Sequence, residues 1–343
     1  MAARKTLSIA TCNLYNINKP GLPIYNDTDG WNQIDYDKKV AWTSSILTNL
    51  TSDVWGFQEL WHKDSLTDVF GAAGLLADYD LLVPQDHTGQ RIICAGAVRK
   101  GILVGDPEWI VNFPDKFTMK SGGDDAQTSD ISVQIDKFSR PILHFKIRPR
   151  SNGKVISVYV VHFKSKGPTK LYREQWYKQD KEYFSKHSAG IGAAISTIRR
   201  TAEAAALRMI LTEEMKGNSK PVIVLGDCND GQHSNTLNIV TEQPNYLLSG
   251  STGGSDTALY TVGTLEEYRS LSDVYYTHTF KNSRESLDHI LVSQEFYDNS
   301  RKRIWAFKGM HIINDHLNEE KEHKNNGTSD HGIVRTAFEY RPA

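Results

Sequence analysis

Oxygen-bearing side chains directly follow a buried apolar segment near the middle of the chain. Residues 221–230 read PVIVLGDCND, in which Gly226 ends an apolar run and Asp227, Asn229 and Asp230 follow at once. A short apolar run rich in β-branched residues predicts a buried strand. Because open α/β sheets place their ligands beyond the carboxyl ends of their strands, this segment predicts a chemical site.

The same kinds of side chain stand at or just beyond the ends of other apolar runs. They are Asn13, Glu59, His162, Asp288, Asp330 and His331. Carboxylate and amide oxygens suit hard cations such as Mg²⁺, Mn²⁺ or Ca²⁺, and histidine can hold a phosphate oxygen or move a proton. A hard cation neutralises phosphate charge while a carboxylate activates water, so the set predicts a metal-dependent phosphoesterase.

Each of these residues alone has an ordinary structural explanation. A single Asp or Asn after a strand is usually a turn or capping residue. A histidine beside an acid, such as His289 beside Asp288, is usually structural. Zinc is disfavoured because the clustered histidines near the end of the chain have no HExxH spacing and no Cys partner. These histidines are His311, His316, His323 and His331.

Bulk charge excludes one class of protein. The chain has 343 residues with 40 Lys and Arg against 41 Asp and Glu, for a net charge of −1. A nucleic-acid binder that works by overall basicity is therefore excluded, and polyanion binding must come from a local patch or a metal. Three cysteines without a CxxC pair make a disulfide framework unexpected, and we expect Cys12 and Cys228 to be packing residues.

The chain has no segment that suggests a membrane span or an obligate protein partner. Its longest apolar runs are too short to cross a bilayer. The first residues, MAARKTLSIATCNLY, are basic but lack the apolar core of a signal peptide. Localisation therefore stays open between the cytoplasm and secretion with a leader removed.

Many strands interleaved with a few helices predict an α/β fold. Strands are expected at 6–15, 54–60, 79–83, 92–103, 131–135, 142–147, 155–163, 222–225, 287–292 and 332–338. Helices are expected at 37–50, at 64–76 and within 171–216, the last broken near 188–192. Residues 235–271 are expected to be irregular, and 311–331 a polar loop. Short links, as between Phe145 and Val155, indicate antiparallel pairs and hence mixed sheets. The absence of a linker predicts one domain over 1–343.

Six segments, read in order, resemble the motifs of the endonuclease/exonuclease/phosphatase superfamily, the deoxyribonuclease-like phosphoesterases. They are ATCNLY, WGFQEL, VVHFKSKG, VLGDCND, SLDHILVS and TSDHGIV, and they span residues 7–334. GDxN followed by LDHI and then SDH is a specific combination. The resemblance implies a four-layer α/β sandwich of two mixed β-sheets packed face to face and flanked by helices.

The resemblance also implies roles for the metal and water side of the site. Glu59 would be the main metal carboxylate, with Asn13 beside it and Asp330 completing the set around Mg²⁺ or Mn²⁺, with Ca²⁺ as a further option. Asp227 would orient or activate the attacking water, and Asn229 would hold the phosphate.

On the phosphate side, the resemblance implies two histidines and an arginine. His331 would contact the scissile phosphate with Asp288 behind it, and His162 would assist the leaving group. Arg140, in FSRPIL, matches a phosphate-contacting arginine of the nuclease branch. Tyr15 stands where some relatives have an acidic ligand, which disfavours a second protein-bound metal.

The segment HFKSKG is similar to bacterial extracellular and broad-specificity nucleases. Lys164 and Lys166 would then give a local positive edge for a nucleic-acid backbone, although both could equally be ordinary solvated residues. The arginine pattern of inositol-polyphosphate phosphatases near GD and LDHI is absent. A sphingomyelinase-type membrane loop would have to come from aromatic residues for which packing is the stronger interpretation: Trp109, Phe113 and Phe117.

We therefore expect a divalent-metal-dependent phosphodiesterase, specifically an endonuclease acting on DNA, with RNA also open, and with little sequence specificity. The alternative enzyme is a phosphoesterase for a phospholipid, as in sphingomyelinases, or for an inositol phosphate. A catalytically silent binding module is disfavoured because every motif carries a chemically competent residue. The arginines of the long helical segment are expected on its solvated surface: Arg199, Arg200 and Arg208.

Overall fold

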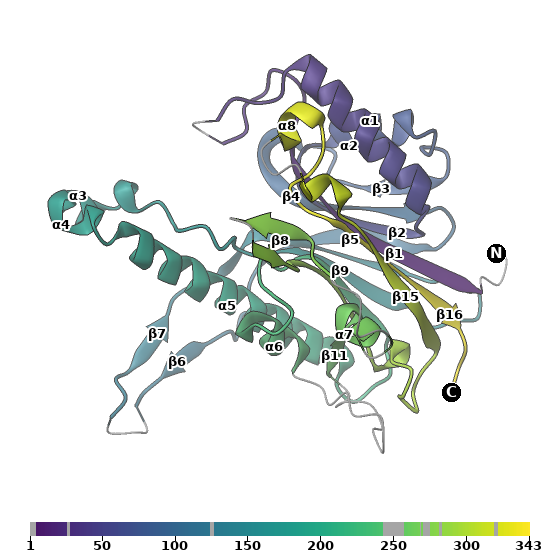
Figure 1. The fold of residues 1–343 in the computed structure, drawn as a ribbon. Helices are drawn as coiled ribbons and strands as arrows, with labels where there is room; N and C mark the ends of the chain where they lie inside the picture. The colour runs from purple at the N-terminus through teal and green to yellow at the C-terminus, as the bar shows by residue number, and fades with distance from the viewer. Residues whose placement is uncertain are drawn as a thin grey trace.

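The computed structural model in Figure 1 describes residues 5–25, 28–123, 127–242, 257–267, 269, 275–280, 283–318 and 322–343. Two six-stranded sheets pack face to face between outer helices, which confirms the predicted four-layer sandwich. The first sheet has the order β15 (Trp305–Ile313), β16 (Ile333–Tyr340), β1 (Thr6–Ile17), β2 (Val54–His62), β4 (Thr88–Arg99), β3 (Tyr79–Leu82). The second has the order β11 (Leu259–Thr261), β14 (Asp288–Ser293), β10 (Val222–Asp227), β9 (Ile156–His162), β8 (Lys137–Ile147), β5 (Leu103–Asn112).

Three apolar layers hold the sandwich together. The central core lies between the sheets and includes Ile9, Phe145 and Leu225, all essentially without solvent exposure. Outside the first sheet pack α1 (Gln33–Leu50) and α2 (Lys63–Ala72), and outside the second pack α5 (Ser188–Met215) and α6 (Asn235–Thr241). Burial of apolar area on both faces of each sheet explains why their strands are nearly continuous hydrophobic runs.

Strand register brings the predicted motifs to one end of both sheets. β1 runs parallel to β2, and β9 runs parallel to β10, so four carboxyl ends lie at the same edge. Asp227 pairs directly with His162 on one side and with Asp288 on the other. β16 is antiparallel to β1, with Val334 opposite Thr11, so the segment before β16 returns to the end of β1.

Gly226 allows the backbone conformation at the end of β10. Its φ is +139°, and a Cβ there would lie 2.1 Å from the carbonyl oxygen of Val161 on the neighbouring strand. Only glycine fits this combination of backbone angle and close approach. The glycine that ends the apolar run in the sequence therefore sets the direction in which Asp227 leaves the strand.

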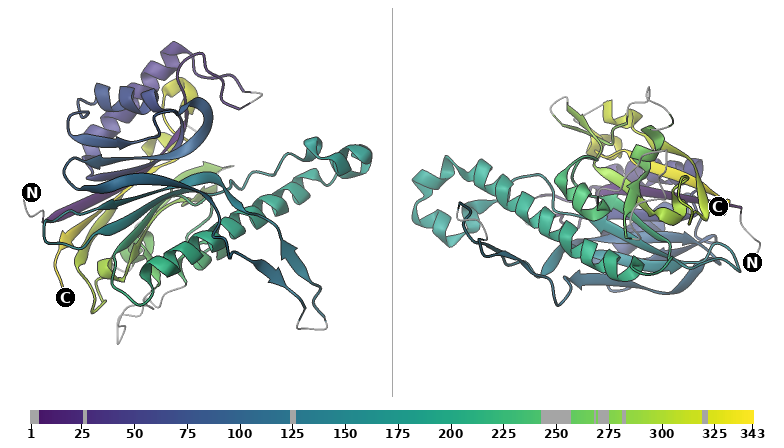
Figure 2. Two further views of the ribbon diagram at one scale, coloured as in Figure 1. Left: turned by 180° about the vertical axis from the view of Figure 1, so that it is seen from behind. Right: turned by 90° about the horizontal axis from the view of Figure 1, so that it is seen from below.

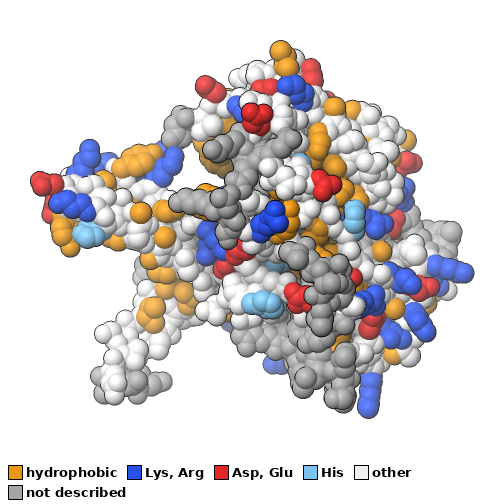
Figure 3. Space-filling model, in the orientation of Figure 1, with side chains coloured by type: hydrophobic (Ala, Val, Ile, Leu, Met, Phe, Trp, Pro, Cys, Tyr) orange, Lys and Arg blue, Asp and Glu red, His pale blue; other side chains and the backbone are white. Residues whose placement is uncertain are grey.

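Two arms project from the sandwich (Figure 2). One is the hairpin of β6 (Met119–Ser121) and β7 (Ile131–Val133). The other is helical and contains the 3₁₀ turn η1 (Leu171–Arg173), α3 (Gln175–Gln179), α4 (Lys181–Ser185) and the first half of α5. The predicted break in this helical segment is present, although it falls at residues 186–187 and not within 188–192. On the face shown in Figure 3, the tip of the helical arm mixes cationic, acidic and hydrophobic side chains.

Two stretches are more regular than the sequence indicates. Residues 235–271 contain α6, β11 and α7 (Val262–Glu267), while 243–256, 268 and 270–271 lie outside the described residues. Residues 311–331 contain the end of β15, the 3₁₀ turn η3 (Asp315–Asn318) and α8 (His323–Asn326). A register shift between Phe307 and Gly309 breaks the alternation of polar and apolar residues in β15, so the strand is hidden in the sequence.

The remaining elements are small. They are the two-stranded sheet of β12 (His278–Phe280) and β13 (Ser283–Glu285), and the 3₁₀ turn η2 (Gln294–Phe296). The predicted single strand at 92–103 is wrong, because β4 ends at Arg99 and β5 begins at Leu103 after a turn. Among the described helices, none has the length and hydrophobicity needed to cross a bilayer.

Candidate active site

Side chains from both sheets meet at the shared strand end. His162 Nε2 lies 3.5 Å from Asp227 Oδ2 and 3.8 Å from Glu59 Oε1. Asn13 Nδ2 donates to Asp227 Oδ2 at 3.3 Å. We call this group, with its neighbours, the active-site floor; its members are Asn13, Glu59, His162, Asp227, Asn229, Asp288, Asp330 and His331. The register of the four central strands thus assembles what lies far apart in the sequence.

His331 is held from two directions. Its Nδ1 lies 2.8 Å from Asp288 Oδ2, and its Nε2 lies 3.9 Å from Asp227 Oδ2. Its backbone N–H donates to Ser329 Oγ at 3.1 Å, and this hydroxyl donates to the Asn13 carbonyl at 2.8 Å. Ser329 therefore fixes the loop before β16 to the end of β1, and the imidazole points its free nitrogen toward Asp227.

Asn229 orients Asp227. Its backbone N–H donates to Asp227 Oδ1 at 2.8 Å, and its side-chain amide donates to Asp227 Oδ2 and to the Phe163 carbonyl, both at 3.0 Å. Both amide hydrogens are therefore engaged inside the protein. Asn229 therefore fixes the carboxylate of Asp227, and its predicted contact with phosphate stays a prediction.

Backbone strain is concentrated at this edge. Seven of the described non-glycine residues have φ in the left-handed region, and two of them, Thr51 and Glu242, are ordinary helix C-caps. The other five lie at the floor or beside it: Tyr15, Asn16, Tyr25, Glu59 and Asn229. Such conformations persist where the surrounding structure over-determines them, and they cluster at functional sites.

The strain around Glu59 follows from a bulge. The register of β1 against β2 shifts between Asn13 and Ile17, and β2 against β4 shifts after Phe57. Bulges turn a side chain out of the normal alternation. Glu59 is thereby aimed into the site, where the backbone N–H of Asn16 donates to its Oε2 at 2.9 Å.

Burial and charge separate the two histidines. Burial, with the charges of Arg140 and His331, holds the pKa of His162 well below its ordinary value. Burial also opposes the charged form of His331, but the carboxylates of Asp288 and Asp227 outweigh it and hold the His331 pKa well above its ordinary value. At neutral pH a neutral imidazole therefore faces a cationic one.

Two carboxylates of the floor, those of Asp227 and Glu59, have raised pKa values. Burial raises the pKa of Asp227 to about 7, against the lowering effect of His331. Burial, and next the charge of Asp330, raise the pKa of Glu59. The charge of Asp330 thus disfavours ionisation of Glu59, and a cation bound between them would relieve this effect.

The oxygen donors fit a hard divalent cation. Glu59, Asp330 and Asn13 offer carboxylate and amide oxygens, as Mg²⁺ prefers. Asp330 also belongs to a group with His331 and His278 whose ligand atoms all lie within 4.8 Å of one another. When bound, such an ion neutralises phosphate charge and steadies the leaving oxygen. His278 had no recognisable motif in the sequence and is a site neighbour that sequence reasoning missed.

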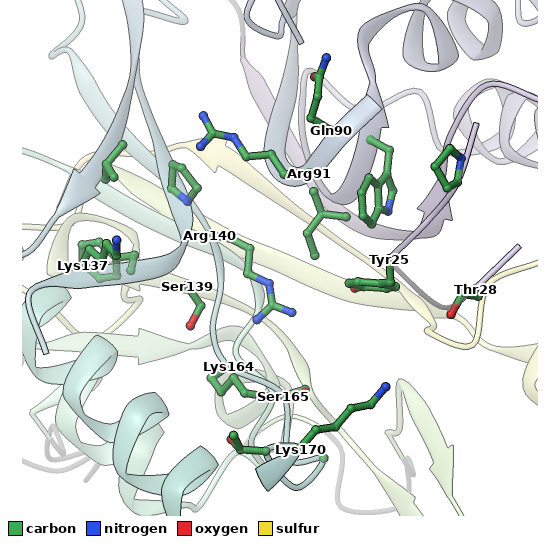
Figure 4. A pocket seen from close by; sticks show the side chains of 18 of the residues that line it. Tyr25, Thr28, Gln90, Arg91, Lys137, Ser139, Arg140, Lys164, Ser165 and Lys170 are labelled. Atoms are coloured by element: carbon green, nitrogen blue, oxygen red, sulfur yellow. Dashed lines mark hydrogen bonds between the residues drawn. The ribbon is translucent and has the colours of Figure 1, made fainter. Parts of the chain in front are cut away.

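A cleft of about 1160 Å³ opens beside the floor (Figure 4). Six of the described residues that line it are cations, and none is a carboxylate. We call it the cationic cleft; the cations are Arg91, Lys137, Arg140, Lys164, Lys170 and Arg173. Arg140 connects it to the floor, because its Nη1 donates at 3.3 Å to the carbonyl of Phe163, the residue after His162.

The cations of the cleft lie close enough to affect one another. Within the described part of the chain, no carboxylate forms an ion pair with Arg91, Lys137, Arg140, Lys164 or Arg173. Burial, and next the charge of Arg140, lower the pKa of Lys164. Buried Glu203 accepts the backbone N–H groups of Ser139 and Lys164, each at 2.7 Å, and so ties two walls of the cleft together.

Three predicted cations have other environments. Lys166 is exposed and pairs with Asp230 at 3.4 Å and with Glu285, away from the cleft lining. The expectation that Arg200 and Arg208 are solvated is wrong. Arg200 is buried against Asp230 and the Lys164 carbonyl, and Arg208 donates to the Val240 carbonyl at 2.9 Å. Both lie on the side of α5 that faces the protein, which charge spacing alone does not reveal.

Other residues singled out in the sequence are structural. Phe113 stacks edge to face with Phe117, inside the apolar layer under α5, so the packing interpretation is confirmed. Trp109 donates to the Cys94 carbonyl at 2.9 Å. His316 Nε2 lies 2.9 Å from the His331 carbonyl, which supports the floor from below. Cys12 and Cys228 are buried and free.

Comparison with known proteins gives one family match. A sequence model described as the Endonuclease/Exonuclease/phosphatase family matches residues 10–331. No curated protein matches the chain.

Several solved structures are similar in fold. An endonuclease/exonuclease/phosphatase from Bacteroides vulgatus is 16% identical, covering 98% of this chain and 100% of that chain, with a TM-score of 0.55. A mannosyl-6-phosphatase from Bacteroides thetaiotaomicron is 15% identical, covering 97% and 100%, with a TM-score of 0.54. D. rerio TDP2 complexed with single strand DNA product is 15% identical, covering 98% and 99%, with a TM-score of 0.53. At these identities the similarity establishes the fold alone.

Proposed function

The chain belongs to the endonuclease/exonuclease/phosphatase family, and on that premise we propose that this phosphoesterase is a divalent-metal-dependent endonuclease. Its substrate would be DNA, and RNA as well, cut with little sequence preference. The proposal separates into the chemistry of the active-site floor and the choice of substrate, which rest on different observations.

The floor supports hydrolysis of a phosphodiester. Asp227, with a pKa raised by burial to about 7, would take a proton from the attacking water, while Asn229 keeps its oxygens in place. His331, held cationic by Asp288, would stabilise the charge that develops on the phosphoryl oxygens. His162 would act on the leaving-group side.

The metal would be Mg²⁺ or Mn²⁺, with Ca²⁺ as a further option, held by Glu59, Asp330 and Asn13. Their oxygen donors, and the mutual charge of Glu59 and Asp330, support this assignment.

The observation that carries the nucleic-acid substrate is the cationic cleft. A strand of nucleic acid presents a phosphate at every nucleotide, and its binding depends on neutralising several of them at once. Six cations in a lining that has no carboxylate among its described residues match that requirement, in a chain whose overall charge is −1. A sugar monophosphate has one charged group and needs fewer cations.

A second candidate is a phosphoesterase for a small polyanion such as an inositol phosphate, which the same cations would also attract. A phospholipid substrate has less support, because Phe113 and Phe117 are packed under α5 and do not offer an exposed apolar loop. Because a mannosyl-6-phosphatase is among the proteins of similar fold, sugar phosphates should also be tested as substrates.

The test is incubation with supercoiled plasmid and Mg²⁺ or Mn²⁺, with a chelator control and the His162→Ala variant. We expect nicking followed by degradation, lost in both controls. An intact plasmid together with phosphate release from inositol phosphates or sugar phosphates would replace the nuclease by the second candidate. Nucleic-acid binding without turnover in any metal would indicate a catalytically silent binding module.

A further inference from the structure

Tyr25 is a solvent-exposed aromatic residue beside the active-site floor. It lines the cationic cleft, and 45% of its surface is exposed (Figure 4). Its φ is +58°, a left-handed conformation that is unfavourable for a side chain of this size. An exposed ring kept in a strained backbone conformation indicates that its position serves the cleft and not the core.

The ring of Tyr25 is braced from within the protein. It meets Trp61 edge to face, with ring centroids 5.1 Å apart and planes at 88°. Trp61 is 5% exposed, packs with Ile24 and Ile92, and donates from Nε1 to Asn16 Oδ1 at 3.0 Å. Tyr25 therefore has a fixed support on one side and the cleft on the other.

Tyr25 also lies within reach of the chemistry. Burial raises the pKa of its hydroxyl, the charge of Glu59 raises it further, and Arg140 lowers it. Both the metal carboxylate of the floor and the arginine that joins floor and cleft are thus close enough to act on this hydroxyl. A group bound against Tyr25 would be a close neighbour of the phosphate at the floor.

The cations of the cleft come from two parts of the structure. Arg91, on β4, and Lys137, at the start of β8, form one side, where the hairpin arm leaves the sheet. Lys164 and Arg173 belong to the segment that leads into the helical arm. An aromatic platform inside a groove of cations is the arrangement that binds single-stranded nucleic acids, because every base has a face that can stack.

We propose that the cationic cleft binds a single-stranded stretch of nucleic acid next to the scissile phosphate, with one unpaired base stacked on Tyr25. Arg91, Lys137 and Arg140 contact the backbone phosphates on this side. In a duplex both faces of each base are already covered by its neighbours, so Tyr25 can engage only a base that is unstacked. The inference rests on the proposed nuclease function and adds a strand preference to it.

The test measures binding in the presence of a chelator, so that cleavage does not interfere. The probe is a fluorescein-labelled eight-nucleotide DNA strand, together with eight versions that each carry one abasic position. Fluorescence anisotropy gives the Kd for wild type, Tyr25→Ala and Tyr25→Phe. Thermal melting of each variant shows that it is folded, and Tyr25→Phe keeps the ring if Tyr25→Ala does not fold.

For the intact strand we expect Tyr25→Ala to weaken binding about tenfold, the effect of losing one base–aromatic stack, and Tyr25→Phe to bind within about twofold of wild type. One abasic position should weaken wild-type binding by a similar factor and have no effect on Tyr25→Ala. The same DNA as a blunt duplex should bind wild type more weakly than the single strand does. Tyr183→Ala removes an equally exposed tyrosine, 56% exposed on α4, and should change nothing.

Three results would overturn the inference: unchanged binding by Tyr25→Ala, abasic penalties that are equal in wild type and variant, or a duplex that binds as tightly as the strand. Each of them is compatible with plasmid nicking, so the inference can fail while the nuclease function stands. Conversely, a Tyr25-dependent abasic penalty without plasmid cleavage would support the binding site and reject the nuclease.

Discussion

The active-site floor and the cationic cleft lie side by side and are built in opposite ways. The floor uses strand ends, where paired backbones fix each side chain and most of its members are buried with hydrogen-bond partners. The cleft uses loops, strand edges and the bases of two arms, and no carboxylate is among the described residues that line it. The first arrangement suits chemistry that tolerates little displacement, and the second suits a polymer that binds by charge.

This difference separates the two steps of the reaction. Changes in the floor should act on turnover, since its groups matter most in the transition state. Changes in the cleft should act on substrate binding and on its salt dependence.

Asp227→Asn should lower kcat about 10³-fold with little change in KM, because the variant keeps the shape of the side chain and loses its ability to accept a proton. Initial rates on a labelled oligonucleotide measure both constants. Asp106→Asn, an exposed acid on β5, is the matched control and should be unchanged. A variant that keeps a tenth of the wild-type kcat would remove Asp227 from the role of base.

Asp288→Asn should lower kcat by about 10–100-fold, the usual effect of removing a group that orients another. The pKa of His331 is held high by Asp288 and Asp227, so loss of the Asp288 charge lets it fall. The alkaline limb of the kcat profile should therefore move to lower pH in the variant. Rates between pH 5 and 10 test this, and an unshifted limb with lowered kcat would indicate a purely structural role for Asp288.

Lys137→Ala should raise KM by a few-fold, leave kcat unchanged and reduce the slope of log Kd against log salt by about 1. Lys146→Ala is the control on the same strand. Lys146 is exposed opposite Ser157 at the other end of β8, and it does not line the cleft. Equal effects of both substitutions would mean that the cleft is not distinguished from the rest of the surface.

Burial of Asp227 should also make the stability of the protein depend on pH. The pKa of Asp227 is raised by burial from 3.8 to about 7, so the folded state holds a proton that the unfolded chain releases between these values. Its contribution to stability is therefore lost as pH rises from about 4 to 7. In chelator, the melting temperature of Asp227→Asn should rise relative to wild type across that window, and parallel curves would contradict the assignment.

The active-site floor could be predicted from the sequence because its residues lie at strand ends. An apolar run that stops at Gly226 and continues with Asp227 can be read from a single segment, and the family resemblance brought the separate segments together. The sandwich could be predicted for the same reason, since buried strands are recognisable in a sequence as short apolar runs. The fold is confirmed by the structure, whereas the roles of the site residues stay predictions.

The cleft was largely invisible in the sequence. Tyr25 lies in a loop rich in Gly, Pro, Asn and Asp, and Arg91 and Lys137 stand at strand positions that look like ordinary solvated charges. Their convergence depends on where the two arms leave the sheets, which is a property of tertiary structure. The same limit explains why Arg200 and Arg208 were wrongly expected on the solvated surface. Periodicity predicts which residues share a helix face but does not show what packs against that face.

The left-handed residues at the floor have a consequence for engineering. Tyr15, Asn16, Glu59 and Asn229 hold backbone conformations that side chains disfavour, and the two asparagines are the only pair among them with a natural tolerance for this region. Selection for heat resistance would favour substitutions at these four positions that remove the backbone strain. Selection for catalysis would favour keeping the present residues. Libraries screened for melting temperature and libraries screened for turnover should therefore diverge first at these four positions.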